Sequence, residues 1–187
     1  MNGEEMLKKT LALIEEVNPN NENLTDDPDI AAKQVEVMNQ VMFELARFKK
    51  IPKYVETPVT KGQTVTFENI ERECGYEVYQ IKMVGGVGYT PKADGTVLKF
   101  TEDGMAEIEV YVYPERITEK TKLKAYEFDL SPDVLEIMPY GIAADLLKSD
   151  VSTEYGAIYA QRFETMLARL DPRYQMTGIS IEGGVRI

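Results

Sequence analysis

The residues that could carry chemistry in this chain are its carboxylates and one cysteine, because histidine is absent. Without histidine, neither a Ser-His-Asp triad nor a Cys-His pair can form within the chain. The usual zinc ligand sets are excluded as well, and carboxylates alone could serve calcium or magnesium. Cys74 stands between Glu73 and Gly75, where acidic surroundings disfavour the reactive thiolate. We therefore do not expect Cys74 to act as a nucleophile.

Three carboxylates, Asp133, Glu136 and Asp145, lie near one another in the sequence. A carboxylate pair that performs acid–base chemistry must be brought together in a cleft that perturbs its ionisation. Nothing in the pattern singles out such a pair, and solvated helix faces account for the acidic residues. The sequence therefore predicts a protein that is not an enzyme and that uses no cofactor or metal.

A glycine-rich segment, residues 85–88, is the place where a phosphate-binding loop has to be considered. It reads Gly85-Gly86-Val87-Gly88, without the Lys-Ser/Thr of a P-loop and without the Rossmann spacing. It also follows a strand-like segment and does not open a helix. We expect a loop or a β-bulge here.

The composition is that of a globular domain with a core of its own. Hydrophobic residues make up 43% and charged residues 28% of 187 residues. No apolar run has the length of a membrane span, and the acidic start does not resemble a signal peptide, so synthesis in the cytoplasm is the default. The net charge of −11 disfavours binding to nucleic acid, which depends on Lys and Arg displacing counterions. The basic run 47–50 is typical of a helix C-terminus.

Two helices are expected at the start of the chain. Residues 4–17 carry apolar side chains at helical spacing. Asp27 and Pro28 mark the start of a second helix, which runs to about Lys49 before Pro52. A calcium-binding loop at residues 26–29 is the alternative, but the glycine and the trailing glutamate of such a loop are missing at the required spacing.

The hydrophobic period changes from 3.6 to 2 in the middle of the chain, which indicates strands. The expected strands are 64–67, 76–83, 96–100 and 106–113. Strands joined by short turns favour an antiparallel meander or a small sandwich, which should pack on the helices or on a neighbouring subunit. Tyr111 and Tyr113 face outward in the last strand. They can form cross-strand pairs or a partner surface, and we favour cross-strand pairs.

A polar crossing, residues 114–130, leads to a second pair of helices. Ser131 and Pro132 repeat the signals of a helix start. Pro139 should kink or split the helix that follows, because proline removes a backbone donor and clashes with the preceding turn. Residues 155–170 carry the apolar face of the last helix.

The tail, residues 176–187, alternates apolar residues with glycine and polar residues. Such an extended terminus can add a strand to the sheet of another subunit, or it can fray. The candidate partner-binding residues are Tyr174, Ile179, Ile181, Val185 and Ile187.

These elements predict an α+β fold: a four-helix body, built from two N-terminal and two C-terminal helices, with an inserted small antiparallel β domain and an extended C-terminal arm. The predicted segments are 1–52 for the N-terminal helical pair, 53–130 for the β domain and crossing, 131–171 for the C-terminal helical pair and 172–187 for the arm.

In this order the residues resemble the head-to-tail adaptor (connector) proteins of tailed bacteriophages, including the tail tubular protein A type of short-tailed phages. The resemblance covers residues 27–171, and its most specific part is residues 111–170. It is carried by an Asp-Gly-Thr-Val-Leu strand at 94–98, a Tyr-x-Tyr-Pro-x-x-Ile-Thr strand exit at 111–118 and the helix at 140–147. None of these motifs is a catalytic signature.

The resemblance implies a structural virion protein, made in the cytoplasm of the bacterial host and located at the head–tail junction. It implies a ring, commonly of twelve copies, between the portal protein and a downstream tail or nozzle protein. Double-stranded DNA would pass through the ring without specific binding, and acidic walls would repel its phosphates. The helices would line the channel and the arm 176–187 would engage the portal. The compact β insert and the glycine-rich arm depart from the family pattern and leave the neighbour of the arm open.

A different interpretation keeps the fold and changes the role. The chain would then be another phage tail, baseplate or surface protein whose β module binds a protein or a carbohydrate. Copy number separates the two, because heterologous contacts close into rings where the rotation permits.

Overall fold

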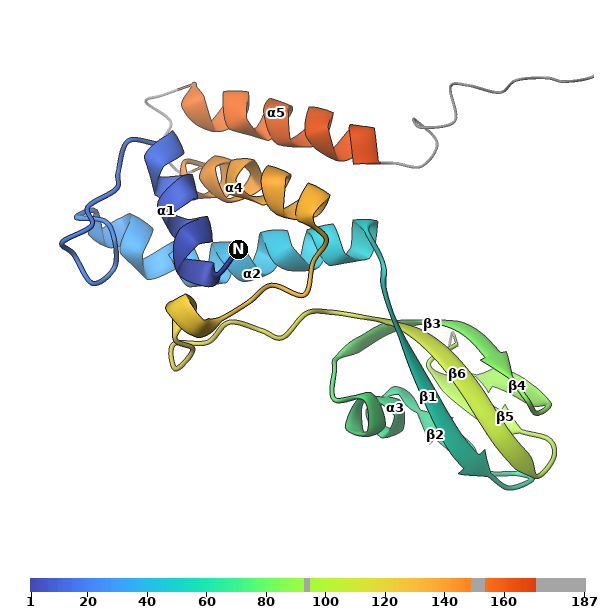
Figure 1. Cartoon of the computed structure of the whole chain (residues 1–187). Helices are drawn as coiled ribbons and strands as arrows, with labels where there is room; N and C mark the ends of the chain where they lie inside the picture. The colour runs from blue at the N-terminus through green and yellow to red at the C-terminus, as the bar shows by residue number, and fades with distance from the viewer. Residues whose placement is uncertain (93–94, 149–153, 171–187) are drawn as a thin grey trace, which may run out of the picture.

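The computed structural model describes residues 1–92, 95–148 and 154–170, and it confirms the predicted α+β class (Figure 1). Its helices are α1 (Gly3–Leu13), α2 (Pro28–Phe48), α3 (Phe67–Cys74), α4 (Pro132–Leu146) and α5 (Tyr155–Leu170), with the 3-10 turn η2 (Leu123–Ala125). Its strands are β1 (Ile51–Val59), β2 (Thr64–Thr66), β3 (Val78–Gly85), β4 (Tyr89–Lys92), β5 (Val97–Phe100) and β6 (Gly104–Val112). Helices α1, α2, α4 and α5 gather at one end, and the strands and α3 form the β unit at the other (Figure 1).

Helix α1 begins one residue before the predicted residue 4, and α2 begins at the cap that the sequence predicts. Asn2 and Glu5 form a capping box at α1. The Asp27 carboxylate accepts from the N–H groups of Asp29 (2.8 Å) and Ile30 (3.1 Å), which confirms the predicted start of α2. Helix α1 ends at Leu13 and not at residue 17, because Glu15 takes a positive φ of 62° that turns the chain.

Helix α4 occupies the middle of the helical body. It packs against α1, α2 and α5, and Gly141 marks the tightest approach. A Cβ atom there would lie 2.8 Å from the Phe163 ring of α5 and 2.9 Å from Val41 of α2. Pro139 is buried inside α4, which continues as one helix to Leu146, so of the two predicted outcomes, a kink or a split, the split is wrong. Packing against three helices compensates for the backbone bond that the proline removes.

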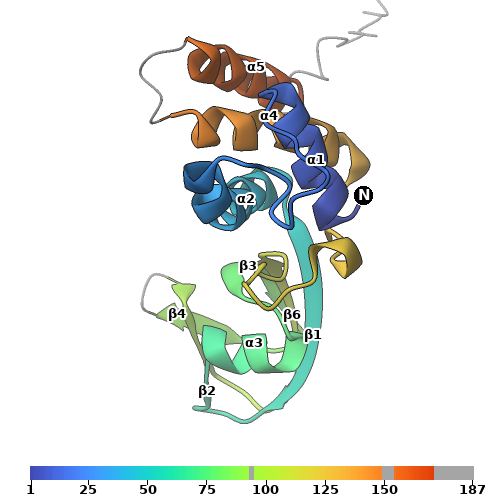
Figure 2. The same ribbon diagram turned by 90° about the vertical axis from the view of Figure 1, so that its left-hand side faces the viewer.

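The β unit consists of two three-stranded antiparallel sheets, in the orders β1-β6-β3 and β2-β5-β4. Strand β1 pairs with β6 along its whole length, from Ile51 opposite Val112 to Val59 opposite Gly104. Figure 2 shows β1 leaving the end of α2 and running down into the β unit. The side chains that form the second hydrophobic core lie between the sheets and against α3: Val55, Val59, Val65, Ile70, Val78, Leu98, Phe100, Ala106, Ile108, Val110 and Val112.

The β unit is larger than the predicted four strands. Strands β1 and β4 were not expected, because Pro52, Pro58 and Pro91 argue against strands; both are edge strands, where proline is tolerated. The predicted strand 64–67 ends at Thr66, and α3 follows directly. The Asn69 side chain accepts from the Thr66 N–H at 3.0 Å and closes the first turn of α3.

One buried amide fixes the segment that returns from the β unit to the helical body. Asn39 of α2 is 2% exposed. Its amide nitrogen donates to the Ile117 carbonyl at 2.8 Å, and its oxygen accepts from the Ile117 N–H at 2.9 Å. The side chain thus satisfies both backbone groups of a buried residue that belongs to no helix or strand.

Replacing Asn39 with leucine is expected to lower the free energy of unfolding by several kcal/mol. The Ile117 N–H and carbonyl would each lose their partner, and an unsatisfied buried group costs about 1–3 kcal/mol. Urea denaturation followed by circular dichroism measures the loss. The matched control is Gln40→Leu at the exposed neighbouring position, where a change within about 0.5 kcal/mol is expected. Equal losses in the two variants would contradict a specific role of Asn39.

Candidate interaction surface

A row of aromatic rings crosses from the outer face of the β1-β6-β3 sheet onto helix α2. Tyr79 of β3 stacks on Tyr111 of β6 at 6.3 Å between ring centroids and contacts Tyr113 at 4.8 Å. Tyr113 in turn lies 4.8 Å from Phe43 of α2. We call these four residues the aromatic row. The prediction of cross-strand pairing is confirmed for Tyr111, whereas the predicted outward position of Tyr113 is wrong, because Tyr113 follows β6 and is 6% exposed. Through its contact with Phe43 the row also joins the β unit to the helical body.

Cations cover the aromatic row. Arg47 lies over Tyr113 at 5.3 Å, Lys50 over Tyr111 at 4.7 Å and Lys82 over Tyr111 at 5.9 Å. Arg116 lies over Phe43 at 4.8 Å. These distances are those of cation–π contacts, which contribute about 0.5–1 kcal/mol each at exposed sites.

The four cations differ in their ion pairs. Lys82 pairs with Glu109 at 2.6 Å, and Arg116 pairs with Glu36 at 3.6 Å. Arg47 instead donates to the Tyr113 hydroxyl. Among the residues that the structure describes, Arg47 and Lys50 have no carboxylate partner. Of the four cations over the aromatic row, these two are therefore the ones that an anionic partner could pair with.

A buried carboxylate, that of Glu109, lies at the end of the aromatic row that is distant from helix α2. Glu109 is 4% exposed, and it accepts from Lys82 and from the Tyr54 hydroxyl at 3.0 Å. The hydrogen bond from Lys82 is the main reason why the pKa of Glu109 lies below its ordinary value, and burial opposes the shift. Tyr54 itself is 72% exposed. It presents an aromatic ring to the solvent next to the row.

Tyr79 ties the row to the end of α2. Its hydroxyl donates to the Ala46 carbonyl at 3.0 Å, which is one of the last carbonyls of the helix and lacks an intrahelical partner. Burial raises the pKa of Tyr79 to about 12, with smaller contributions from Tyr113 and Tyr111 that Arg47 opposes. Tyr79 is therefore both a cap for α2 and a member of the stack.

A groove of about 740 Å³ opens where the row meets the helical body. Phe43, Phe48, Tyr113 and Leu167 form its apolar walls, and its other lining residues are Gln40, Glu44, Arg47, Glu77 and Arg116. Burial raises the pKa of Glu44, and the nearby carboxylates of Asp145 and Glu164 add to the shift. Aromatic walls with arginines at the edge are typical of protein interaction surfaces.

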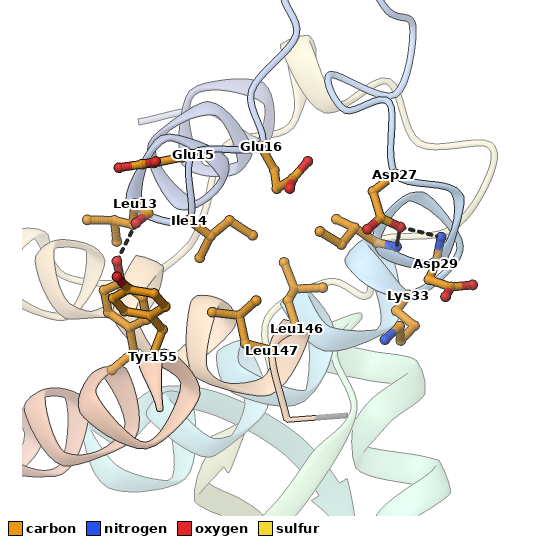
Figure 3. A pocket seen from close by; sticks show the side chains of 12 residues that line it. Leu13, Ile14, Glu15, Glu16, Asp27, Asp29, Lys33, Leu146, Leu147 and Tyr155 are labelled. Carbon is orange, nitrogen blue, oxygen red and sulfur yellow. Dashed lines mark hydrogen bonds between the residues drawn. The ribbon is translucent and has the colours of Figure 1, made fainter. Parts of the chain in front are cut away.

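A second pocket, of about 500 Å³, lies at the opposite end of α2 (Figure 3). Ile14, Leu146 and Leu147 point into it from α4 and from the end of α1. The charged residues around it are Glu15, Glu16, Asp27, Asp29 and Lys33, and the remaining lining residues are Leu13, Ile30, Tyr155 and Tyr159. The Tyr159 hydroxyl donates to the Leu13 carbonyl and holds α5 against α1. The pocket is apolar inside and acidic at its edge.

The residues considered for chemistry are not brought together. Asp133 begins α4 and Asp145 lies near its end, so about 18 Å of helix separates them. Asp133 pairs with Lys49 at 2.8 Å, and this hydrogen bond is the main reason why the pKa of Asp133 falls to about 2. The described part of the chain contains no group of three or more acidic, cysteine or histidine side chains that could hold a metal ion.

The glycine-rich segment 85–88 connects β3 with β4, as the loop interpretation predicted. Gly86 has a φ of 80°, and a Cβ atom there would lie 2.3 Å from the Met105 carbonyl oxygen. The Glu102 carboxylate accepts from the Gly88 N–H at 2.5 Å. The Gly88 N–H is therefore already paired with a carboxylate of the chain itself.

The predicted partner-binding residues Tyr174, Ile179, Ile181, Val185 and Ile187 lie outside the described residues, as does the arm 172–187. The aromatic row was recognised only in part. Tyr111 and Tyr113 were visible as outward residues of a strand, whereas the basic run at 47–50 was ascribed to the helix dipole. No signal in the sequence places that run over Tyr111 and Tyr113, because the contacts join distant parts of the chain.

Comparison with known protein families and with curated proteins yields no match for this sequence. No helix among the described residues is long and apolar enough to cross a membrane.

Replacing Tyr79 with phenylalanine is expected to make the free energy of unfolding fall less steeply at alkaline pH. The folded state holds the pKa of Tyr79 at about 12, against an ordinary value of 10.0. The unfolded chain therefore loses this proton first, and the free energy of unfolding falls between pH 10 and pH 12. In the phenylalanine variant this contribution to the pH dependence is absent.

The variant is also expected to be less stable at neutral pH by about 0.5–1.5 kcal/mol, because it lacks the bond to Ala46. Urea unfolding at a series of pH values measures both effects. Tyr89→Phe, at a 39% exposed residue of edge strand β4, is the control and should keep the wild-type values. An unchanged alkaline slope in Tyr79→Phe would refute the assignment.

Proposed function

We propose that this protein is a structural head-to-tail adaptor of a tailed bacteriophage, which forms a ring between the portal and the tail. The observation that carries the proposal is the architecture. A helical body made from both ends of the chain is interrupted by a β unit, whose connecting strands β1 and β6 lie side by side. This order of elements agrees with the motifs at residues 94–98, 111–118 and 140–147, on which the resemblance is based.

The character of the surface supports an assembling role. The pronounced features of the described residues are an aromatic row covered by cations at one end of α2 and an apolar, acidic pocket at the other. Surfaces that combine aromatic residues and arginine with exposed apolar side chains are typical of protein–protein contacts.

In this role the ring would surround the path of the double-stranded DNA without binding it. The net charge of −11 suits such a channel, because like charges keep phosphates from adhering to its wall. The arm 172–187 would engage the portal through its apolar residues, and the β unit would face the downstream tail or nozzle protein. The protein would act without a cofactor and reside in the virion.

One observation favours a second function. Tyr54 is 72% exposed beside Tyr111 and Lys82, and exposed tyrosines on a sheet can stack against a sugar or a protein side chain. In that case the chain is a tail, baseplate or surface component whose β unit binds a carbohydrate or a protein.

The adaptor proposal predicts that the protein assembles on the portal of its own phage in a fixed number of copies, twelve by the resemblance. Mass photometry of the portal with and without the protein measures the added mass. A variant with Ile179→Asp and Ile181→Asp is expected to lose the interaction, because charges in an apolar arm prevent its docking.

The matched control is Glu119→Gln on the exposed crossing segment, which should bind as the wild type does. A wild-type protein that leaves the mass of the portal unchanged would contradict the adaptor proposal. Binding to a glycan that is lost in Tyr54→Ala would support the second function instead.

A further inference from the structure

We infer that copies of this chain contact one another head to tail, with an acidic, apolar corner of one copy lying against the aromatic row and cations of the next. The inference rests on the proposed ring and names the two surfaces that close it. It follows from three features: exposed apolar side chains at the corner, uncompensated cations at the row, and the position of both at opposite ends of α2.

The corner is formed where α1 ends and α5 begins. Tyr155, which lines the pocket, is 61% exposed, and Val17 and Ile158, which are close in sequence to lining residues, are 42% and 52% exposed. Next to them, Ile14 and Leu147 point into the pocket shown in Figure 3. A partner that covers this corner would bury apolar surface that the monomer leaves in water.

The charge at the corner is negative. Glu15 and Glu16 are exposed, and Asp27 and Asp29 belong to the first turn of α2. Lys33 is the one cation among the residues that line the pocket. The partial positive charge of the α2 N-terminus is already matched by the Asp27 cap. The exposed carboxylates of Glu15 and Glu16 would suit a partner with cations beside apolar groups.

The other end of α2 has the complementary composition. Arg47 and Lys50 have no carboxylate partner among the described residues, and Phe48 between them is 37% exposed. The aromatic row and the groove continue this surface toward the β unit. Glu44 and Glu77 also line the groove and oppose the attraction, so Lys50, outside the groove, is the cation best placed to meet a carboxylate.

One molecule cannot satisfy both surfaces by itself, because α2 is 21 residues long and its ends are about 30 Å apart. A contact that joins the corner of one copy to the row of the next is heterologous. It repeats in one direction and closes into a ring when the rotation between copies permits. A two-fold dimer that paired both surfaces reciprocally would stop at two copies, so cross-linked species larger than a dimer distinguish the repeating contact from it.

Disulfide trapping tests the contact directly. In a Cys74→Ser background, a chain carrying both Glu16→Cys and Lys50→Cys is expected to form a ladder of cross-linked species larger than a dimer under mild oxidation. Each single-cysteine variant should form no cross-link, because the contact joins two different surfaces. The pair Glu119→Cys and Lys50→Cys is the matched control and should remain uncross-linked.

Charge reversal provides an independent measurement that does not require oxidation. Glu16→Lys and Lys50→Glu are each expected to weaken self-association at least about tenfold in sedimentation velocity, and a chain carrying both should recover the wild-type value. Circular dichroism verifies that each variant is folded. Self-association that is unaffected by either reversal overturns the inference, and so does a chain that stays monomeric up to its solubility limit.

The two tests separate the contact from the proposed function. Rings that assemble on the portal without the 16–50 cross-link overturn the contact and leave the adaptor proposal standing. A cross-linked ladder from a chain that does not bind the portal supports the contact and overturns the adaptor proposal.

Discussion

The two hydrogen bonds between Asn39 and Ile117 determine where the chain rejoins the helical body after the β unit. Ordering the segment between β6 and α4 costs about 1–2 kcal/mol per residue, and these two bonds offset part of that cost together with the bonds of Tyr126 to the Glu115 carbonyl and to the Gly3 N–H. With the Asn39 bonds, the return point is fixed on α2 itself. Helix α4 then starts close enough for Asp133 to reach Lys49, and the first and second halves of the body pack on one core.

The junction between the body and the β unit is also where the chemistry of the surface concentrates. Tyr79 caps α2, Tyr113 contacts Phe43, and Arg47 lies over Tyr113, so the contacts that orient the β unit are aromatic and cationic. The junction between the helical body and the β unit is therefore only partly buried. Its inner rings hold the two parts together, while Lys50 and Tyr54 at its margin remain available to other molecules.

Local signals in the sequence predicted the elements that have strong caps and clear periodicity. Asp27 and Pro28 located the start of α2, and the alternation of Ile108, Val110 and Val112 located β6. Strand β1 was missed because its two prolines are acceptable only at a sheet edge, which is a property of the topology. The aromatic row was missed as a whole because it joins residues 43, 79, 111 and 113, and no local pattern connects those positions.

The pairing of Ile51 with Val112 has a consequence for how this protein can diversify. The two points at which the chain leaves and rejoins the helices are neighbours across one antiparallel ladder, within about 6 Å of each other. A module tethered by two adjacent points can be shortened, enlarged or exchanged for another without re-routing a single helix. A change in the length of the β unit would therefore leave the covalent path of the helical body unaltered.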